Sequence, residues 1–307
     1  MPANYSDISV VITCYREGEL LREAVNSVRQ QTKQPDEIVV VNDASPDKAT
    51  NRVCRQLEKE DDVRVIWQAQ NGGPSIARNA GFAAAQGEIL VPLDADDLLP
   101  SQALAHIYQA FSEHPDAGFI YGDYVRQNQP GKNEVVRAKP ISLATMLRSR
   151  RFSLSTNWTL IGTAPLKKWL WETVGHSDPT LGAEDLHDLE FWIRAMNLPC
   201  KFYPLPEVIY IWRKYLGSNS RRITPMSWHR IAEKHYITYQ KAGLEYRANE
   251  LLLLGSKWLG NADQIKKYSR ELKNSLRYGE FQFSTWMILL IPAKLVRPLT
   301  NWISHRR

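Results

Sequence analysis

A short apolar segment followed at once by three carboxylates constrains this chain more than any other stretch of its sequence. Residues 88–100 read E-I-L-V-P-L-D-A-D-D-L-L-P, and the apolar half has the length of a buried strand. Asp94, Asp96 and Asp97 come directly after it. Clustered carboxylates at the end of a buried strand are unfavourable unless a positive group lies beside them. The segment therefore predicts a positively charged partner at this strand end.

Two interpretations of these acids stay open from this stretch alone. Hard divalent cations prefer oxygen ligands and are commonly held by one or two carboxylates together with substrate phosphates. Open α/β sheets bind ligands at the carboxyl ends of their strands, so the first interpretation is a metal and diphosphate site. The second is a solvated turn that caps a helix over residues 98–111, because acids are common helix N-caps.

Apolar strand segments alternate with helical patterns over the first hundred residues. Strands are predicted at 8–13, 37–41, 63–67 and 88–93, and helices at 17–31, 48–59 and 76–85. This alternation predicts a parallel α/β sheet, in which the carboxyl ends of the strands share one edge. Polar residues follow three of the strands, so we expect them to converge, which favours the ligand-site interpretation. The chain has no Gly-x-Gly-x-x-Gly after the first strand and no Gly-Lys-Ser/Thr loop, which argues against dinucleotide-binding and P-loop domains.

Four motifs in fixed order carry a resemblance to a known family. They are V-V-I-T-C-Y-R-E (10–17), V-V-V-N-D-A-S-P-D (39–47), N-G-G-P-S-I-A-R-N-A-G (71–81) and V-P-L-D-A-D-D (91–97). The series resembles the family 2 inverting glycosyltransferases, and the similarity covers roughly residues 7–220. It implies a GT-A fold, an α/β class with a mostly parallel sheet flanked by helices.

The resemblance also implies a division of the chain. The GT-A catalytic domain would occupy residues 1–222, with the nucleotide-sugar half at about 1–123 and the acceptor half at about 124–222. Residues 223–307 would form a helical C-terminal region.

Donor-site roles come from the resemblance position by position. Thr13, Tyr15 and Glu17 match residues near the base and ribose, and Asp43 matches the acid that bonds the base, usually uracil. Arg78 matches a basic residue near the nucleotide, although a salt bridge to a neighbouring acid is its structural alternative. In the D-x-D motif, Asp94 would approach the ribose and Asp96 would bind the metal. Asp94 is also a candidate metal ligand, and Mn²⁺ or Mg²⁺ is the expected cofactor.

Departures from the family pattern occur at Asn42, Ala44 and Tyr215, and also at His187, where the family usually has Glu. The family more often has D-D-G-S-x-D where this chain has N-D-A-S-P-D, so Asn42 and Ala44 differ while Asp43 keeps its place. Farther along, Tyr215 stands where the family often has a His that helps to bind metal or diphosphate. The metal assignment is weaker for that reason.

The catalytic base has two candidate positions. The family shows E-D-x-D/E-x-W-x-R, and counting back from Trp192 and Arg194 places the base at Asp188. The alternative is Asp185, which needs a three-residue insertion before the tryptophan. All these acids are also favoured in the first turn of a helix for structural reasons alone. In an inverting transfer the base takes the proton of the acceptor hydroxyl as the nucleoside diphosphate leaves.

The C-terminal region is basic. Residues 221–307 contain 16 Lys and Arg and 6 Asp and Glu, so their net charge is +10. The first 220 residues have a net charge of −4, which gives +6 for the whole chain. Trp286–Ala293 is apolar but too short to span a bilayer, which needs about 20 residues. Trp286 and the flanking Lys294 fit an interfacial membrane segment. A buried helix is equally compatible with the pattern.

Composition supports an intracellular setting. The three cysteines are widely spaced and odd in number, which predicts neither a disulfide framework nor a zinc site. The N-terminus has no signal-peptide pattern, so we expect a cytoplasmic protein, peripheral on the inner face of the cell membrane if the C-terminal segment binds lipid. No nucleic-acid-binding motif is present.

Taken together, the resemblance implies an inverting transferase that uses a nucleotide-diphosphate sugar, with a UDP-sugar favoured. The acceptor would be the hydroxyl of a saccharide or lipid-linked molecule in cell-surface polysaccharide or glycolipid synthesis. The alternative is a catalytically inactive GT-A domain that serves as a membrane or assembly scaffold. The departure at Tyr215 favours that alternative.

Overall fold

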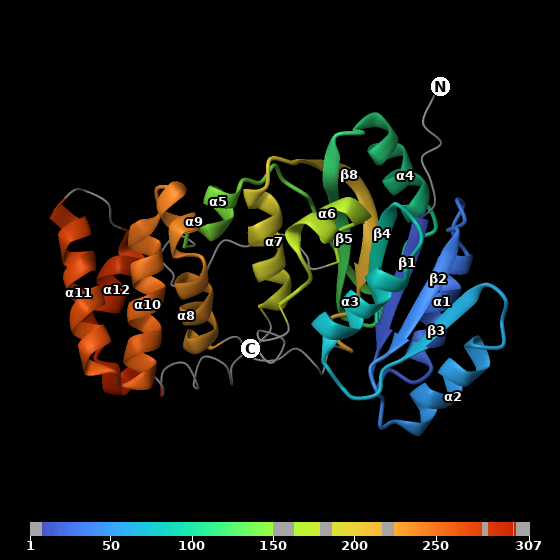
Figure 1. Cartoon of the computed structure of the whole chain (residues 1–307), viewed down its shortest axis with the longest axis horizontal. Helices are drawn as coiled ribbons and strands as arrows, with labels where there is room; N and C mark the ends of the chain where they lie inside the picture. The colour runs from blue at the N-terminus through green and yellow to red at the C-terminus, as the bar shows by residue number, and fades with distance from the viewer. Residues whose placement is uncertain are drawn as a thin grey trace. The chain divides into compact units, whose positions relative to one another are not determined.

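The chain divides into two compact units. A computed structural model describes residues 8–149, 163–178, 186–216, 224–277, 282–296 and 298. Of these, the first unit contains the residues up to 140 with 163–178 and 187–216, and the second contains 141–149, 186 and the residues from 224 onward. Figure 1 labels the helices of both units and the strands of the first unit except β6 and β7.

The first unit is built on a mixed sheet of eight strands within the described residues. Its order is β3-β2-β1-β4-β7-β5-β6, with β8 paired to β5. The neighbours β3, β2, β1 and β4 are parallel, as the sequence predicts, and β7 is antiparallel to β4 and β5. The strands are β1 Ile8–Cys14, β2 Glu37–Asn42, β3 Val63–Trp67, β4 Ile89–Asp94, β5 Ala117–Gln129, β6 Lys132–Val136, β7 Leu166–Lys167 and β8 Lys201–Trp212.

Helices cover both faces of this sheet. The apolar residues of α1, α2 and α4 join alternate residues of β1, β2 and β4 in one core on the first face. On the opposite face α3 packs on β1 and β2, and Trp192 of α7 packs on Phe119 of β5. The helices of this unit are α1 Leu20–Arg29, α2 Lys48–Leu57, α3 Pro74–Ala84, α4 Ala103–Glu113, α6 Lys168–Val174 and α7 His187–Asn197.

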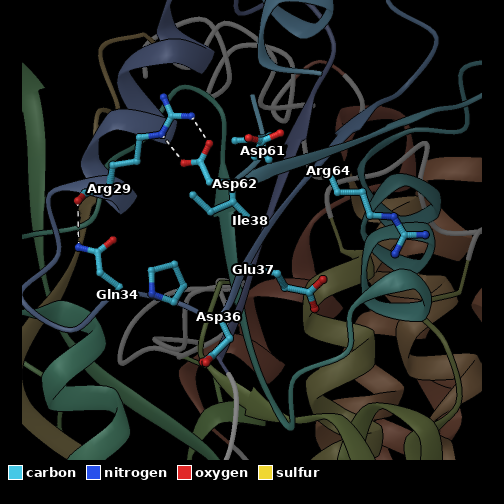
Figure 2. Close-up of a pocket in the computed structure, with 10 residues that line it drawn as sticks. Arg29, Gln34, Asp36, Glu37, Ile38, Asp61, Asp62 and Arg64 are labelled. Atoms are coloured by element: carbon cyan, nitrogen blue, oxygen red, sulfur yellow. Dashed lines mark hydrogen bonds and ion pairs between the residues drawn. The ribbon is translucent and has the colours of Figure 1, made fainter. Parts of the chain in front are cut away.

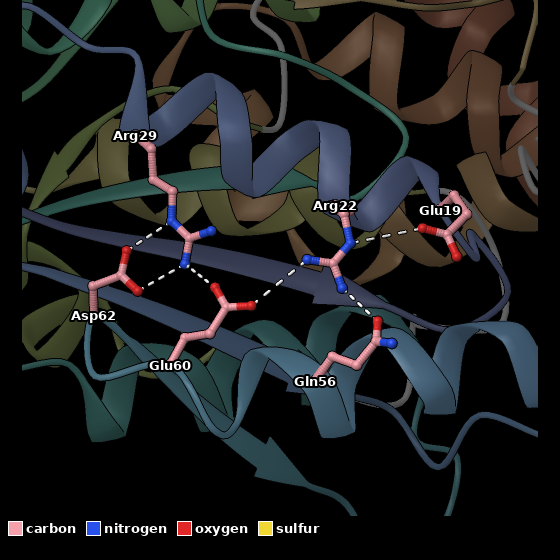
Figure 3. Close-up of polar contacts among 6 residues, drawn as sticks. All are labelled: Glu19, Arg22, Arg29, Gln56, Glu60 and Asp62. Atoms are coloured by element: carbon pink, nitrogen blue, oxygen red, sulfur yellow. Dashed lines mark hydrogen bonds and ion pairs between the residues drawn. The ribbon is translucent and has the colours of Figure 1, made fainter.

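An ion-pair network ties α1 to the segment that follows α2 (Figure 3). Arg29 donates from Nε and Nη2 to the two carboxylate oxygens of Asp62, both at 2.7 Å. Arg29 also contacts Glu60, whose other oxygen lies 3.6 Å from Arg22 Nη1. The bidentate contact holds the end of α1 against the residues that precede β3. It lies at the amino ends of the strands, and the acids that follow β4 lie at the carboxyl ends.

The second unit is helical in its described residues. It contains α5 Leu143–Leu147, α8 Pro225–Lys234, α9 Tyr236–Lys241, α10 Glu245–Leu259, α11 Ala262–Arg277 and α12 Phe283–Leu290. Helix α10 packs against α8, α9, α11 and α12, and its Leu251, Leu252 and Leu253 are buried. Within the described part of the chain, no helix has the length and hydropathy needed to cross a bilayer.

Close packing of α3 on the sheet depends on Gly81. A Cβ atom at this position would lie 2.3 Å from Val11 Cγ1 and 3.0 Å from Val41 Cγ2. Real side chains do not approach so closely, so only glycine lets the helix sit at its present height above β1 and β2. Arg78 lies three residues earlier, on the same face of the helix. The helix position therefore also sets the position of that arginine.

We predict that Gly81→Ala destabilises the protein by about 1–3 kcal/mol, since overpacking forces strain or a backbone shift. Helix propensity alone gives the opposite sign, a gain of about 1 kcal/mol. Urea unfolding distinguishes the two. Ala83→Ser, at an exposed position of the same helix, is the control and should change stability by less than about 0.5 kcal/mol. A stabilised Gly81→Ala variant would contradict the packing argument.

Candidate functional site

The carboxyl ends of β1, β2 and β4 bring the predicted site residues to one edge. Thr13 pairs in register with Asp94, and Cys14 pairs with Asn42. The backbone N–H of Asp43 donates to the carbonyl of Cys14 at 3.0 Å. The predicted convergence of the polar clusters is therefore present in the sheet.

The three acids after β4 form a tight turn. The N–H of Asp97 donates to the carbonyl of Asp94 at 2.9 Å. Helix α4 begins only at Ala103, with Gln102 at its N-cap position. The interpretation of the acids as caps of a helix starting at residue 98 is therefore wrong, because the chain first runs through this turn and an isolated bridge from Leu98 to Ile211.

Arg78 joins two of the predicted carboxylates. Its Nη2 lies 3.0 Å from Asp94 Oδ1, and its Nη1 lies 2.6 Å from Asp188 Oδ1. The arginine side chain is 7% exposed, whereas Asp94 and Asp188 are 41% and 36% exposed. The two carboxylates raise the pKa of Arg78 against the effect of its burial, so the group is a permanent cation. A candidate base and a D-x-D acid thus share one buried positive charge.

Helix α7 holds Asp188 in place through its next two turns. Trp192 is buried against Phe119, with ring centroids 4.7 Å apart. Arg194 pairs with buried Glu190 at 2.9 Å and donates to the carbonyls of residues 174, 175 and 176. Glu190 is thereby a structural anchor of the helix. Asp188, in the first turn, is left facing Arg78.

A second contact positions the segment after α6. Asn79 donates from Nδ2 to the carbonyl of Ser177 and accepts from its N–H, both at 3.0 Å. Asn79 follows Arg78 directly, so α3 positions both the arginine and residue 177. Trp171 is buried and stacks on His176 with centroids 4.6 Å apart. Among the described tryptophans of the predicted acceptor half, Trp169 is the most exposed, at 44%.

Negative charge accumulates around the D-x-D motif. Burial raises the pKa of Asp96 to about 6, and the charges of Asp94 and Glu17 add to this effect. Burial also raises the pKa of Glu17, although the N–H groups of Tyr15 and Arg16 that it accepts from act in the opposite direction. These acids lie close enough to repel one another, and a cation placed among them would relieve that repulsion.

Asp97 is anchored by residues that the sequence does not reveal. Its Oδ2 accepts from the Tyr210 hydroxyl and its Oδ1 from the N–H of Arg213, both at 2.7 Å. Burial raises the pKa of Asp97 to about 8, with Asp94 and Asp96 contributing. Arg213 also donates to the carbonyl of Asp96 and to Glu23. These bonds position the D-x-D turn against β8, more than a hundred residues away in sequence.

Asp43 supports a loop. Its carboxylate accepts from Asn71 Nδ2 at 2.9 Å and from the N–H groups of Gly72 and Gly73 at 2.9 and 2.8 Å. Burial raises its pKa despite these bonds. Asp43 is 4% exposed, so in this structure it shapes the loop that leads into α3. Its contact with a nucleotide base stays a prediction.

The departure at Ala44 has a structural counterpart. Ala44 adopts φ +49°, in the left-handed region that glycine enters without penalty. An alanine in this region costs about 1 kcal/mol relative to glycine. The chain nevertheless adopts here the conformation that a glycine would favour. Neighbouring Asn42 accepts from the N–H of Ser45 at 2.8 Å and donates to Asn51 at 2.9 Å, which fixes the turn further.

Of the two remaining predicted positions, one lies outside the described residues and one lies at the surface. Asp185, the alternative base, is the first of these. Tyr215 is described and 39% exposed. Within the described ranges, no group of three or more His, Cys, Asp or Glu side chains is arranged to hold a metal ion.

A separate pocket of about 220 Å³ lies at the other edge of the sheet (Figure 2). Its lining includes the first residues of β2 and β3 together with Arg29 and Asp62. Arg29 is already engaged by Asp62 there. This pocket is far from the carboxyl edge, and the candidate site is the cluster around Arg78.

Arg78→Gln removes the cation shared by Asp94 and Asp188. We expect a loss of about 1–3 kcal/mol of unfolding free energy, less than the ~3–5 kcal/mol of a fully buried pair because both carboxylates reach water. Urea unfolding measures it. The control is Arg126→Gln, which breaks an exposed pair with Glu134 and should cost no more than about 1 kcal/mol. Equal losses of unfolding free energy in the two variants would show that the Arg78 pairs contribute no more than an exposed ion pair.

Comparison with known proteins gives consistent matches. A family model described as Glycosyl transferase family 2 matches residues 9–169, more than half of the chain. Glycosyltransferase GlyG of Streptococcus pneumoniae serotype 4 is 27% identical over 234 residues, which is 73% of this chain and 76% of GlyG. Poly-beta-1,6-N-acetyl-D-glucosamine synthase of Staphylococcus epidermidis is 27% identical over 183 residues, and the match spans 58% of this chain and 44% of the synthase.

A solved structure shows the same fold. The crystal structure of S. aureus TarS 1-349 in complex with UDP-GlcNAc matches with a TM-score of 0.57 at 18% identity, covering 87% of this chain and 80% of that chain. The mixed sheet with flanking helices is therefore the GT-A fold expected from the motifs. The chain belongs to glycosyl transferase family 2 and is a glycosyltransferase.

Proposed function

We propose that this glycosyltransferase moves a sugar from a nucleotide-diphosphate donor to an acceptor hydroxyl with inversion at the anomeric carbon. The observation that carries the proposal is the Arg78 bridge, which holds the candidate base Asp188 beside Asp94 of the D-x-D motif. An inverting transfer needs one base close to the sugar that the donor acids position. The bridge supports that arrangement.

The donor proposed is a UDP-sugar. The similar TarS structure is a complex with UDP-GlcNAc. In this chain Thr13, Asp43 and Asp94 lie together at the carboxyl ends of β1, β2 and β4. The base and ribose of the donor would contact Tyr15 and Glu17, and Asp94 would approach the ribose. Thr13 lies beside them at the end of β1. Asp43 holds the loop that leads into α3. Arg78 would oppose the negative charge of the diphosphate in addition to its carboxylate partners.

Mn²⁺ or Mg²⁺ is the proposed cofactor. Asp96, with Asp94 beside it, offers oxygen ligands of the kind that these ions prefer. Burial, and after it the negative charges of Asp94 and Glu17, raise the pKa of Asp96, and a bound cation would offset both effects. Two carboxylates do not complete a coordination shell, so substrate phosphates and water would supply the remaining ligands. The metal, when bound, neutralises charge on the departing diphosphate.

Asp188 is the proposed base. It is partly exposed, so its carboxylate is accessible to an acceptor hydroxyl, and Arg78 holds its orientation through the 2.6 Å contact. The base accepts the hydroxyl proton while the acceptor oxygen bonds to the anomeric carbon and the nucleoside diphosphate leaves. Asp185 stays the alternative base.

The acceptor proposed is a saccharide or a lipid-linked sugar in cell-surface polysaccharide or glycolipid synthesis. Relatives with polysaccharide-synthase names support this class, and exposed Trp169 offers an apolar face on which a sugar ring can stack. We also propose a cytoplasmic location, which the three free cysteines support because disulfides are rare in a reducing compartment.

A catalytically inactive domain is the second candidate. The observation in its favour is that Arg78 engages the Asp188 carboxylate directly at 2.6 Å, because an ion-paired carboxylate is a weaker base than a free one. Tyr215 in place of the family histidine points the same way. The next two measurements distinguish this candidate from an active transferase.

Calorimetric titration with UDP, GDP and TDP, each with and without Mn²⁺, tests the donor site. We expect UDP to bind in the presence of Mn²⁺ and binding to fall at least about tenfold in Asp96→Ala, a difference of about 1.4 kcal/mol. Asp61→Ala removes an acid from the opposite sheet edge and should bind like wild type. Absence of binding for all three nucleotides would leave the acids with a structural role and favour the inactive domain.

Turnover of Asp188→Asn tests the base. We expect UDP affinity within about threefold of wild type and a loss of about 10²–10⁴-fold in transfer, the contribution typical of a positioned base. Asp185→Asn is the matched comparison and should keep most of its activity. If Asp185→Asn loses transfer while Asp188→Asn retains it, Asp185 is the base and Asp188 is a partner of Arg78 only.

A further inference from the structure

Helix α12 of the second unit turns its two hydroxyl side chains inward and three of its large apolar side chains outward. Ser284, Thr285 and Ile288 are buried. Phe283 and Trp286 are 50% and 46% exposed, and Leu290 is 73% exposed. The last three are spaced i, i+3 and i+7, so they line one face of the helix. A water-soluble surface helix normally has the reverse arrangement.

A buried carboxylate fixes this orientation. Glu250 of α10 has a fully buried side chain, accepts from Ser284 Oγ at 2.9 Å and from Thr285 Oγ1, and pairs with Arg247 at 2.7 Å. Rotating α12 to bury its apolar face would remove both hydroxyl donors from a carboxylate that has no access to water. Such a loss is strongly unfavourable. The exposed apolar face is therefore built into the packing of the unit.

The C-terminal end of α12 is held in the same way. Lys257 of α10 donates to the carbonyls of Ile288 and Ile291, the latter at 2.6 Å. These are carbonyls of the last turn, which have no partner inside the helix. Both ends of α12 are thus fixed to α10, and its outer face is presented as a rigid surface.

The helix that packs beside α12 is basic. Helix α11 contacts α12 and carries exposed Lys266, Lys267, Arg270 and Lys273 on its solvent side. Beyond α12, Lys294 and Leu295 are also exposed. The charge of +10 over residues 221–307 would make two copies of this region repel each other. It would attract a surface of negative charge.

We propose that the α12 face formed by Phe283, Trp286 and Leu290 docks on an anionic lipid bilayer. The helix has eight residues, about 12 Å long, so it lies at the interface and does not span. Aromatic and leucine side chains enter the boundary between headgroups and acyl chains while lysines and arginines contact lipid phosphates. The inference does not depend on the proposed transfer reaction.

Vesicle flotation of the full chain tests this surface. The probes are vesicles of phosphatidylcholine alone and of phosphatidylcholine mixed with phosphatidylglycerol. We expect wild type to float only with the anionic vesicles, and flotation to fall as salt is raised. The triple variant Phe283→Ser, Trp286→Ser, Leu290→Ser should float at least about tenfold less. Val135→Ser, an exposed apolar residue of β6, is the control and should float like wild type.

Four results would overturn the proposal. In the first, wild type does not float with anionic vesicles, and in the second it floats equally with both kinds of vesicle. In the third, the triple variant floats like wild type. In the fourth, wild type does not float but is a dimer, and the triple variant is a monomer. The last result, measured by light scattering, would assign the face to a second copy. Unfolding curves check that the triple variant is folded. If it is not, the single variant Leu290→Ser replaces it in the flotation test and should float less than wild type.

Discussion

One buried guanidinium holds the candidate site together. Arg78 lies on α3, yet its two carboxylate partners come from β4 and from α7, which is 110 residues away in sequence. Its position depends on how closely α3 approaches the sheet at Gly81, and the position of Asp188 depends on the anchoring of α7 by Trp192 and Arg194. The separation between donor acids and candidate base is therefore set by core packing on one face of the sheet.

Local patterns predict most of the nucleotide half. The first four strands and the helices between them follow from runs of apolar residues and helical spacing, and their parallel order follows from short connections. The second half of the sheet is less accessible to such reasoning. β7 has two residues, and β8 contains two prolines and pairs with β5 through register shifts. β7 is too short to give a strand pattern, and the prolines interrupt the pattern of β8.

The site is predicted as a set of residues, and its internal contacts are not. Glu190 and Arg194 are four residues apart, so their pair is visible in the sequence. Tyr210 and Arg213 are not recognisable as partners of Asp97, because the contact depends on where β8 is placed. Hydropathy likewise identifies α12 as apolar, while Glu250 on another helix decides which face is covered.

Both units contain a buried arginine in contact with a carboxylate that matters for a helix. Arg78 engages Asp188 at the first turn of α7, and Glu250, paired with Arg247, orients α12 through Ser284 and Thr285. The desolvation of such groups costs about as much free energy as their mutual attraction provides, so the contacts add little net stability relative to apolar side chains. They do make alternative orientations unfavourable, since each would leave a charge buried without its partner. In this chain the buried charges therefore account for where functional side chains point, while the apolar core accounts for why the units fold.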